Sequence, residues 1–322
     1  MAVHRFKTRI GLALIGLALC VLPASAERLR VAVAQPGFWN SSFIDFAQQE
    51  GFFAREGLEI EPFYTEGGAS TLTPLIAGSV DVAMSNGFLG VIGAYVKGAP
   101  IRVISAESAG AADSFWYARA ERGIQGLNDL RGKSVAFSST GSSTNLTLLA
   151  LLRQAGVDAK MIATGGVPAT MTQVMSGQVD AGWSVPPFAL KEIREKRLVI
   201  IARGSDVAWL RDMTIRVNLT SVNALKEKRD ALTRYLRALA DAIDWAYSGS
   251  RPLETYSRIA QVPLETAAQT RDEFFPKDSL RLGQIRGLDL ALRQALEMKF
   301  ISAPTKEAEI TRLFDILAPL DR

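Results

Sequence analysis

The segment GSVDVAMS at residues 78–85 has a counterpart in GQVDAGWS at residues 177–184. Each starts at a glycine that follows a predicted helix, passes through Val-Asp into small and apolar residues, and ends in a polar turn. Because both copies stand in a series of alternating strands and helices, they predict two α/β units in one chain. Strands separated by helices at this spacing build a doubly wound, mainly parallel sheet in each unit.

The strands expected around these two copies are short apolar runs that alternate with helical stretches. In the first unit they cover residues 29–34, 58–64, 80–84 and 101–106. In the second unit they cover residues 114–118, 134–137, 160–164, 180–184 and 199–202. Polar turns follow several of these strands, and in doubly wound sheets ligands settle in the crevice outside the carboxyl ends of the strands.

The chain changes character after Asp212. One more strand, at residues 213–219, is followed only by helical stretches, at residues 225–247, 253–261, 264–275, 285–298 and 306–317. A helical tail of this length packs on a sheet, and we place it on the first unit. Lobe 1 then consists of residues 27–112 and 214–322, and lobe 2 of residues 113–213. Two chain crossings, near residues 111–114 and 211–214, would form the hinge between the lobes.

The first 26 residues have the anatomy of a secretory signal peptide. A basic start at residues 4–9 precedes an uninterrupted apolar run at residues 10–22 and the small residues PASA at 23–26. The apolar run is too short to anchor the chain across a bilayer. Leu19 precedes Cys20, where a lipoprotein needs a small residue. We therefore expect cleavage after Ala26 and export to the periplasm.

The composition of the remaining chain excludes several classes of protein. Of 322 residues, 48% are hydrophobic and 22% are charged, which is typical of a globular protein. Loss of the first 26 residues removes the only Cys and the only His, and lowers the formal charge from +4 to about +1. We expect no disulfide, no metal, no cofactor, no Ser-His-Asp triad and no nucleic-acid partner. Chemistry based on carboxylates alone stays open.

The segment SSTGSST at residues 138–144 is the sharpest local signal for a ligand site. It follows a strand and opens an apolar helix, whose N-terminus carries unsatisfied N–H donors and a partial positive charge that suit an anionic group. The run holds more hydroxyls than capping needs, although a capped helix with a solvated loop would show the same pattern. The candidate contacts in it are Ser139, Thr140, Ser142, Ser143 and Thr144.

Aromatic and polar side chains stand near several other predicted strand ends. Trp39, Trp116 and Trp183, with Phe38 close by, could wall a small-molecule pocket. Core or interlobe packing explains the same positions equally well, so both interpretations stay open. The turn Ser85-Asn86 lies between a strand end and a helix start, and is a further candidate for the same cleft.

One cation and three acids lie at positions that could face the cleft. Arg216 stands in an otherwise apolar strand beside the second crossing, where its guanidinium could pair bidentately with a carboxylate or sulfonate, or could face solvent. Glu66, Glu107 and Asp113 lie in predicted loops, and we expect each of them to be solvated.

Five motifs resemble one known family and span nearly the whole mature chain in order. The chain resembles the periplasmic solute-binding proteins of ABC importers, in the branch that binds aliphatic sulfonates, taurine, nitrate and thiamine precursors. The motifs are GFFAREGL (51–58), AGSVDVA (77–83), DLRGKSVA (129–136), LLRQAGV (151–157) and SGQVDA (176–181).

The resemblance implies a two-lobed periplasmic binding protein fold, type II-like, that closes on its ligand and delivers it to an ABC permease in the inner membrane. Family ligand contacts imply Gln35, Phe38 and Trp39 after the first strand, the Ser85-Asn86 turn, the 138–144 loop and Trp183. The chain lacks the Cys run of the pyrimidine-binding branch, which makes that ligand less expected.

We therefore expect a monomeric binding protein, not an enzyme, for a small organic anion. The anion would be a sulfonate or a carboxylate, aliphatic or aromatic, and no matched position decides between them. Two alternatives stay open: a secreted hydrolase or decarboxylase that uses carboxylates in the same cleft, and a periplasmic sensor module of the same fold.

Overall fold

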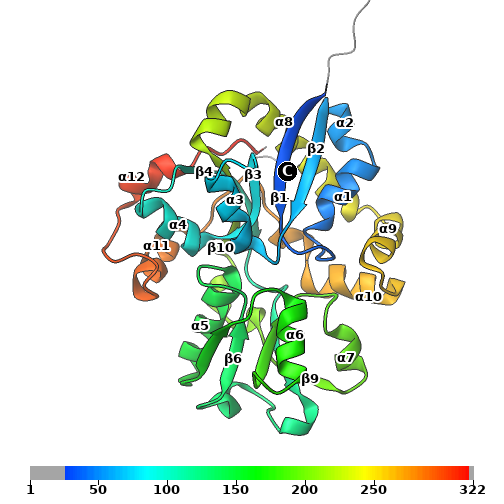
Figure 1. Ribbon diagram of the computed structural model, residues 1–322, viewed down its shortest axis with the longest axis vertical. Helices are drawn as coiled ribbons and strands as arrows, with labels where there is room; N and C mark the ends of the chain where they lie inside the picture. The colour runs from blue at the N-terminus through cyan, green and yellow to red at the C-terminus, as the bar shows by residue number, and fades with distance from the viewer. Residues whose placement is uncertain (1–25, 319–322) are drawn as a thin grey trace, which may run out of the picture.

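A computed structural model describes residues 26–318, and folds them into two α/β lobes that lie one above the other in Figure 1. The sheet of lobe 1 has the strand order β2-β1-β3-β10-β4, in which β10 alone runs antiparallel to its neighbours. Its strands are β1 (Glu27–Val33), β2 (Leu58–Tyr64), β3 (Val82–Gly87), β4 (Ile101–Ala109) and β10 (Thr214–Ser221).

The sheet of lobe 2 repeats this arrangement as β7-β6-β8-β5-β9, with β5 as its antiparallel strand. The two-lobed fold with mainly parallel sheets is thereby confirmed. The strands are β5 (Phe115–Arg119), β6 (Ser134–Phe137), β7 (Lys160–Ala163), β8 (Ala181–Ser184) and β9 (Leu198–Arg203).

Helices cover the sheets, as the apolar central strands require. In lobe 1, α1, α2, α8 and α9 pack together in one group, while α3, α4 and α11 form a second group on the sheet. In lobe 2, α5 packs on β6, α6 on β8 and α7 on β9. The helices are α1 (Ser42–Gln49), α2 (Phe52–Arg55), α3 (Leu72–Ile76), α4 (Phe88–Val96), α5 (Ser143–Ala155), α6 (Val167–Met175), α7 (Leu190–Arg194), α8 (Val222–Ala246), α9 (Arg251–Ala260), α10 (Leu264–Gln269), α11 (Leu288–Glu297) and α12 (Glu307–Ile310).

The repeated Val-Asp step has the same structural role in both lobes. Asp81 accepts a hydrogen bond from the backbone N–H of Arg30 at 2.8 Å and pairs with Lys228 Nζ at 3.0 Å. Asp180 accepts hydrogen bonds from the backbone N–H and the hydroxyl of Ser134, at 2.9 and 2.8 Å. Each carboxylate thus joins the start of its own strand, β3 or β8, to the neighbouring strand, β1 or β6.

Two elements differ from the sequence expectation. The sequence predicts one helix from the cap at residues 41–42 to about residue 54, but this stretch breaks into α1 and α2 because Gly51 adopts a left-handed φ of 72°. The last predicted helix is wrong beyond residue 313. There Asp315 and Leu317 donate backbone hydrogen bonds to the carbonyls of Val103 and Ile104, each at 2.9 Å. The tail ends as an extended segment because the edge strand β4 offers unpaired backbone groups.

The helical tail lies mainly on lobe 1 and also reaches lobe 2. Glu273, in a π-helical turn (Thr270–Phe274) after α10, pairs with Arg203 of β9 at 2.7 Å. Arg194 of α7 donates to the hydroxyl of Thr266 in α10 at 2.8 Å. This part of the tail therefore bridges the two lobes beside the chain crossings.

The two crossings run next to each other. The N–H of Gly110 donates to the carbonyl of Met213 at 3.0 Å, and the N–H of Gly204 donates to the carbonyl of Ser114 at 2.8 Å.

Within residues 26–318 no helix is both long and apolar enough to cross a membrane. The predicted signal peptide and its cleavage site lie almost wholly outside the described residues.

Candidate functional site

A cavity of about 30 Å³ lies between the lobes, and both lobes contribute to its wall. Lobe 1 supplies the turn before α1, the turn after β2, the end of β3 and the middle of β10. Lobe 2 supplies the start of α5 and the end of β8. The wall consists of Ala34, Phe38, Asn40, Gly67, Gly68, Ala69, Ser85, Asp113, Ser138, Ser142, Ser143, Thr144, Trp183, Val185 and Arg216.

The structure brings just over half of the predicted site residues to this cavity. The residues in its wall are Phe38, Ser85, Ser142, Ser143, Thr144, Trp183 and Arg216. The predicted residues outside the wall are Gln35, Trp39, Asn86, Trp116, Ser139 and Thr140. Residues from distant parts of the chain meet here because both sheets point strand ends at the gap between the lobes.

Most of the predicted residues outside the wall have other partners. Gln35 Oε1 accepts a hydrogen bond from the N–H of Val167 at 3.1 Å, which links the lobes. Asn86 Nδ2 donates to Thr71 Oγ1 at 2.9 Å inside lobe 1. Trp116 Nε1 donates to the carbonyl of Ala136 at 2.9 Å inside lobe 2. Thr140 is exposed beside a neighbouring groove.

Trp39 belongs to an aromatic cluster in the core of lobe 1. It is fully buried, and its Nε1 donates to the hydroxyl of Tyr247 at 3.1 Å. Phe43, Phe46 and Tyr256 stand edge-on to its ring, with centroids 6.3, 5.6 and 4.8 Å away. Of the two interpretations left open for Trp39, core packing describes this structure.

Arg216 is the cation of the cavity, and it is already engaged. Its Nη1 pairs with Asp113 Oδ2 at 2.8 Å, and its Nε donates to Ser143 Oγ at 3.0 Å. Asp113 stands in the first crossing and Ser143 starts α5, so Arg216 ties lobe 1 to both. All three side chains are buried.

The expectation that Glu107 and Asp113 are solvated is wrong, because both are buried. The strand β4 runs three residues further than predicted and carries Glu107 into the interior. Its Oε1 accepts hydrogen bonds from Asn40 Nδ2 and Ser85 Oγ, both at 2.7 Å, while its Oε2 has no partner. Burial raises the pKa of the Glu107 carboxyl, although Arg216 and these two donors oppose the shift. Glu66, the third acid, is exposed as expected.

Sequence analysis missed Asn40 and Glu107 as site residues. They line a smaller pocket of about 10 Å³ together with Asp113 and Arg216, which also belong to the cavity wall. An acid among small residues, in the run SAESAGA at 105–111, was the available signal for Glu107. It was weak because small residues suit a loop and a buried strand equally.

The hydroxyl-rich loop at residues 138–144 makes many of its side-chain hydrogen bonds within itself and to the start of α5. Ser142 caps α5, since its Oγ accepts a hydrogen bond from the N–H of Asn145 at 3.1 Å. Thr144 Oγ1 accepts from the N–H of Ser138 at 3.0 Å and lies 3.0 Å from Ser142 Oγ. The loop thus presents a capped helix N-terminus to the cavity.

Trp183 differs from the other buried tryptophans. It lines the cavity, is 2% exposed, and its Nε1–H has no hydrogen-bond partner. Trp116 lies opposite it in the antiparallel pair of β5 and β8 and has its own Nε1–H satisfied. A buried N–H without an acceptor costs about 1–3 kcal/mol, so an acceptor in the cavity would offset that cost.

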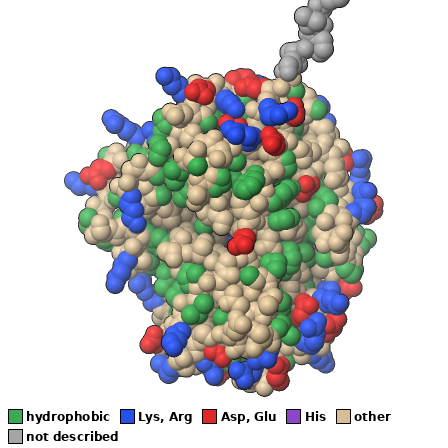
Figure 2. Space-filling view, viewed as in Figure 1, with side chains coloured by type: hydrophobic (Ala, Val, Ile, Leu, Met, Phe, Trp, Pro, Cys, Tyr) green, Lys and Arg blue, Asp and Glu red, His purple; other side chains and the backbone are tan. Residues whose placement is uncertain are grey.

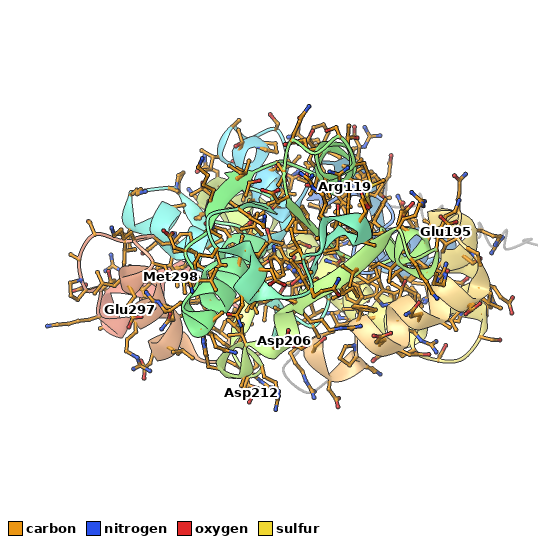
Figure 3. All side chains as sticks on the ribbon, turned by 90° about the horizontal axis from the view of Figure 1, so that it is seen from below. Arg119, Glu195, Asp206, Asp212, Glu297 and Met298 are labelled. Atoms are coloured by element: carbon orange, nitrogen blue, oxygen red, sulfur yellow. The ribbon has the colours of Figure 1, made fainter. Side chains whose placement is uncertain are left out.

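Close contacts hold the lobes together. Phe38 of lobe 1 stands edge-on to Phe188 of lobe 2, with ring centroids 5.7 Å apart. A Cβ atom on Gly90 of α4 would lie 2.3 Å from the carbonyl oxygen of Gly141, so only glycine permits this approach. Glu297 at the end of α11, labelled in Figure 3, pairs with Arg153 of α5 at 2.6 Å. The structure is therefore a closed state.

The middle of the face in Figure 2, at the level between the lobes, is mostly uncharged surface around one acidic group. Basic side chains lie around the edge of this view, at the left, the top, the right and the bottom. Among residues 26–318, no group of three or more His, Cys, Asp or Glu side chains could hold a metal ion.

Comparisons with known proteins agree with this architecture. A family model described as NMT1/THI5 like matches residues 40–250. The alkanesulfonate-binding protein SsuA from Xanthomonas axonopodis pv. citri, bound to MOPS, has a TM-score of 0.75 at 16% identity, over 91% of this chain and 99% of that one. The periplasmic nitrate-binding protein NrtA from Synechocystis PCC 6803 has a TM-score of 0.71 at 14% identity, over 90% of this chain and 86% of that one.

The same fold also occurs in an enzyme. The desulfurization enzyme DSZB has a TM-score of 0.59 at 15% identity, over 92% of this chain and 97% of that one. At these sequence identities, structural similarity is evidence for a shared fold and not for a shared function. No curated protein sequence matches the chain.

Proposed function

Because the chain belongs to the NMT1/THI5-like family, we propose that it is the substrate-binding component of an ABC importer. The observation that carries the proposal is the cavity itself, which lies between two lobes and is lined by both. A site built in this way opens when the lobes part, and it buries its solute when they close.

We propose a small organic solute with an anionic group, a sulfonate or a carboxylate, as the ligand. The capped N-terminus of α5 and the Nε1–H of Trp183 offer donors for such a group. The similar structures named above include an alkanesulfonate-binding and a nitrate-binding protein.

Transport needs a difference between the open and closed states that the permease can recognise. A ligand shifts this equilibrium only by its different affinity for the two states. The contacts that exist only when the lobes meet, such as that between Gln35 and Val167, favour the closed state. A ligand held by both lobes adds to them, and a permease that docks on the closed form would then accept the loaded protein.

We place the protein in the periplasm as a monomer, after cleavage behind Ala26, with an inner-membrane permease as its partner. The signal-like sequence of the first 26 residues and the family support this location. Mass spectrometry of the exported protein should give the mass of residues 27–322. A mature chain that keeps residues 1–26 would contradict the export proposal.

A second candidate function is a secreted enzyme that uses carboxylates. The observation that favours it is the convergence of Glu107 and Asp113 on one small pocket. Against it, Arg216 engages Asp113, and residues 27–322 contain no Cys or His to act as nucleophile or base. Turnover of a bound ligand, followed by mass spectrometry of the mixture, would favour the enzyme.

A thermal-shift screen of the exported protein tests the binding proposal. The panel holds alkanesulfonates, amino-substituted sulfonates, aromatic and aliphatic carboxylates, nitrate and pyrimidines. A ligand at 100 times its Kd adds about 2.7 kcal/mol to the free energy of unfolding, which raises Tm by several degrees. A ligand that binds without turnover supports the proposal, whereas a panel without any shift contradicts a small-anion site.

A further inference from the structure

The charges around the cavity do not suit a simple anion. Among the described residues, the ionisable side chains that line the cavity and the smaller pocket beside it are Arg216, Asp113 and Glu107. One cation therefore faces two acids, and all three are at least 93% buried. A ligand with only a negative charge would therefore enter an interior that is acidic or, at best, neutral, and would find no surplus positive charge to pair with.

The cation is not free to neutralise such a ligand. Two of the three guanidinium nitrogens of Arg216 already have acceptors, Nη1 in Asp113 and Nε in Ser143. An incoming anion would compete with a buried ion pair or leave Asp113 without its partner. Breaking a buried pair is strongly destabilising because it leaves an uncompensated charge.

Two buried polar atoms without partners show what the site lacks. Glu107 Oε2 accepts no hydrogen bond, and Trp183 Nε1 donates none. The carboxylate oxygen calls for a donor on the ligand, while the indole N–H calls for an acceptor. The smaller pocket adds Glu107 and no further cation, so the walls have no surplus positive charge.

On the premise of the proposed function, we infer that the solute of this cleft carries a protonated amine as well as an acceptor group, and has no net negative charge. The ammonium lies at the lobe 1 side, beside Glu107 and Asp113. The acceptor group, a sulfonate or carboxylate oxygen, lies at the lobe 2 side, at Trp183 and the start of α5. Such a solute is zwitterionic or cationic, and a lone sulfonate or carboxylate lacks half of its contacts.

Matched series of ligands separate the amine from the acid. Isothermal titration calorimetry on the exported protein compares propane-1-sulfonate, 3-aminopropane-1-sulfonate and propylamine, and likewise butyrate, 4-aminobutyrate and butylamine. We expect the amino acid or amino sulfonate of at least one series to bind ten or more times as tightly as the matched anion. In Glu107→Gln and Asp113→Asn this preference should fall at least fivefold.

Glu61→Gln is the control variant, because it removes one exposed acid of lobe 1 outside the cavity wall and should keep the preference. An anion without the amine that binds as tightly as its amino partner overturns the inference and leaves the proposed function standing. The same holds if no member of either series binds while the wider screen yields a ligand without an amine. If neither experiment yields a ligand, both the inference and the proposed function fail.

Discussion

Lobe 1 and lobe 2 order their strands in the same way, yet they bring different chemistry to the cavity between them. Lobe 1 contributes Glu107 and Arg216, and the first crossing adds Asp113. Lobe 2 contributes hydroxyls, a helix N-terminus and Trp183, none of them ionised. The ionisable groups of the cavity therefore lie on lobe 1 and at the first crossing, while the part of the wall from α5 and β8 is polar and neutral.

The two antiparallel strands show how one topology yields two roles. β10 and β5 occupy equivalent places in their sheets, each between the third parallel strand and the last. β10 carries Arg216 to the cavity, whereas β5 carries Trp116, whose Nε1–H donates to the carbonyl of Ala136 inside lobe 2. Side-chain identity, and not strand order, decides which lobe holds the charge.

The largest expected effect comes from keeping the lobes apart. Gly90→Ala would place a Cβ 2.3 Å from the carbonyl oxygen of Gly141, which the closed state cannot accommodate. Lobe 1 itself should not suffer, because alanine in place of a helical glycine favours α4 by up to about 1 kcal/mol. We expect ligand affinity to fall about 100-fold, and the radius of gyration in small-angle X-ray scattering to rise.

Gly126→Ala is the matched control for this change, because a Cβ there would meet nothing within 4 Å. It should bind ligand like the unchanged protein. If Gly90→Ala bound equally well, the contact of α4 with Gly141 would not belong to the ligand-bound state, and closure would rest on other contacts.

A pair of tryptophan substitutions separates stability from binding. Trp116→Phe removes a donor and leaves the buried carbonyl of Ala136 unpaired, so the free energy of unfolding should fall by about 2 kcal/mol with affinity within twofold. Trp183→Phe removes an N–H without a partner and should cost about 1 kcal/mol of stability or less, while affinity falls about tenfold. Urea unfolding and calorimetry measure the two quantities. Equal losses of affinity in both variants would refute the distinction.

The smallest effect expected is an opposite pH dependence for one acid from each lobe. The folded-state pKa of Glu107 lies above its usual 4.5 because of burial, so the stability it contributes is present below pH 4.5 and is lost as pH rises through the raised pKa. Burial also opposes the ionisation of Asp180, but hydrogen bonds from Ser134 and the nearby Lys133 and Arg122 outweigh it and lower the pKa below 3.8. Its contribution is present above pH 3.8 and is lost as pH falls through the lowered pKa.

Thermal unfolding between pH 3 and 8 compares the unchanged protein with Glu107→Gln and Asp180→Asn. The Tm advantage over Glu107→Gln should shrink as pH rises, and the advantage over Asp180→Asn should shrink as pH falls. For the buried Glu107 the effect amounts to about 1.4 kcal/mol per unit of pKa shift, and for the more exposed Asp180 solvent screening makes it smaller. Slopes of the same sign would contradict the assignment of opposite environments to the two carboxyls.

The fold could be predicted from the sequence further than the site. The Val-Asp repeat marks real structural equivalents, because Asp81 and Asp180 make the same bond to the neighbouring strand. Glu107 was not predicted as a site residue because three extra residues of β4 decide whether it lies in a loop or inside the protein. The direction in which a tryptophan points depends on tertiary packing, so the sequence alone could not separate Trp183 from Trp39 and Trp116.

The adjacency of the two crossings makes lobe 2 an insertion whose ends meet. Its entry and exit are hydrogen-bonded neighbours, Gly110 with Met213 on one side and Ser114 with Gly204 on the other. Insertions with adjacent ends are the ones that chains gain, lose and exchange without disturbing the host. Replacing the segment from Ser114 to Gly204 by that of a related chain would therefore change the neutral wall of the cavity and leave Glu107, Asp113 and Arg216 in place.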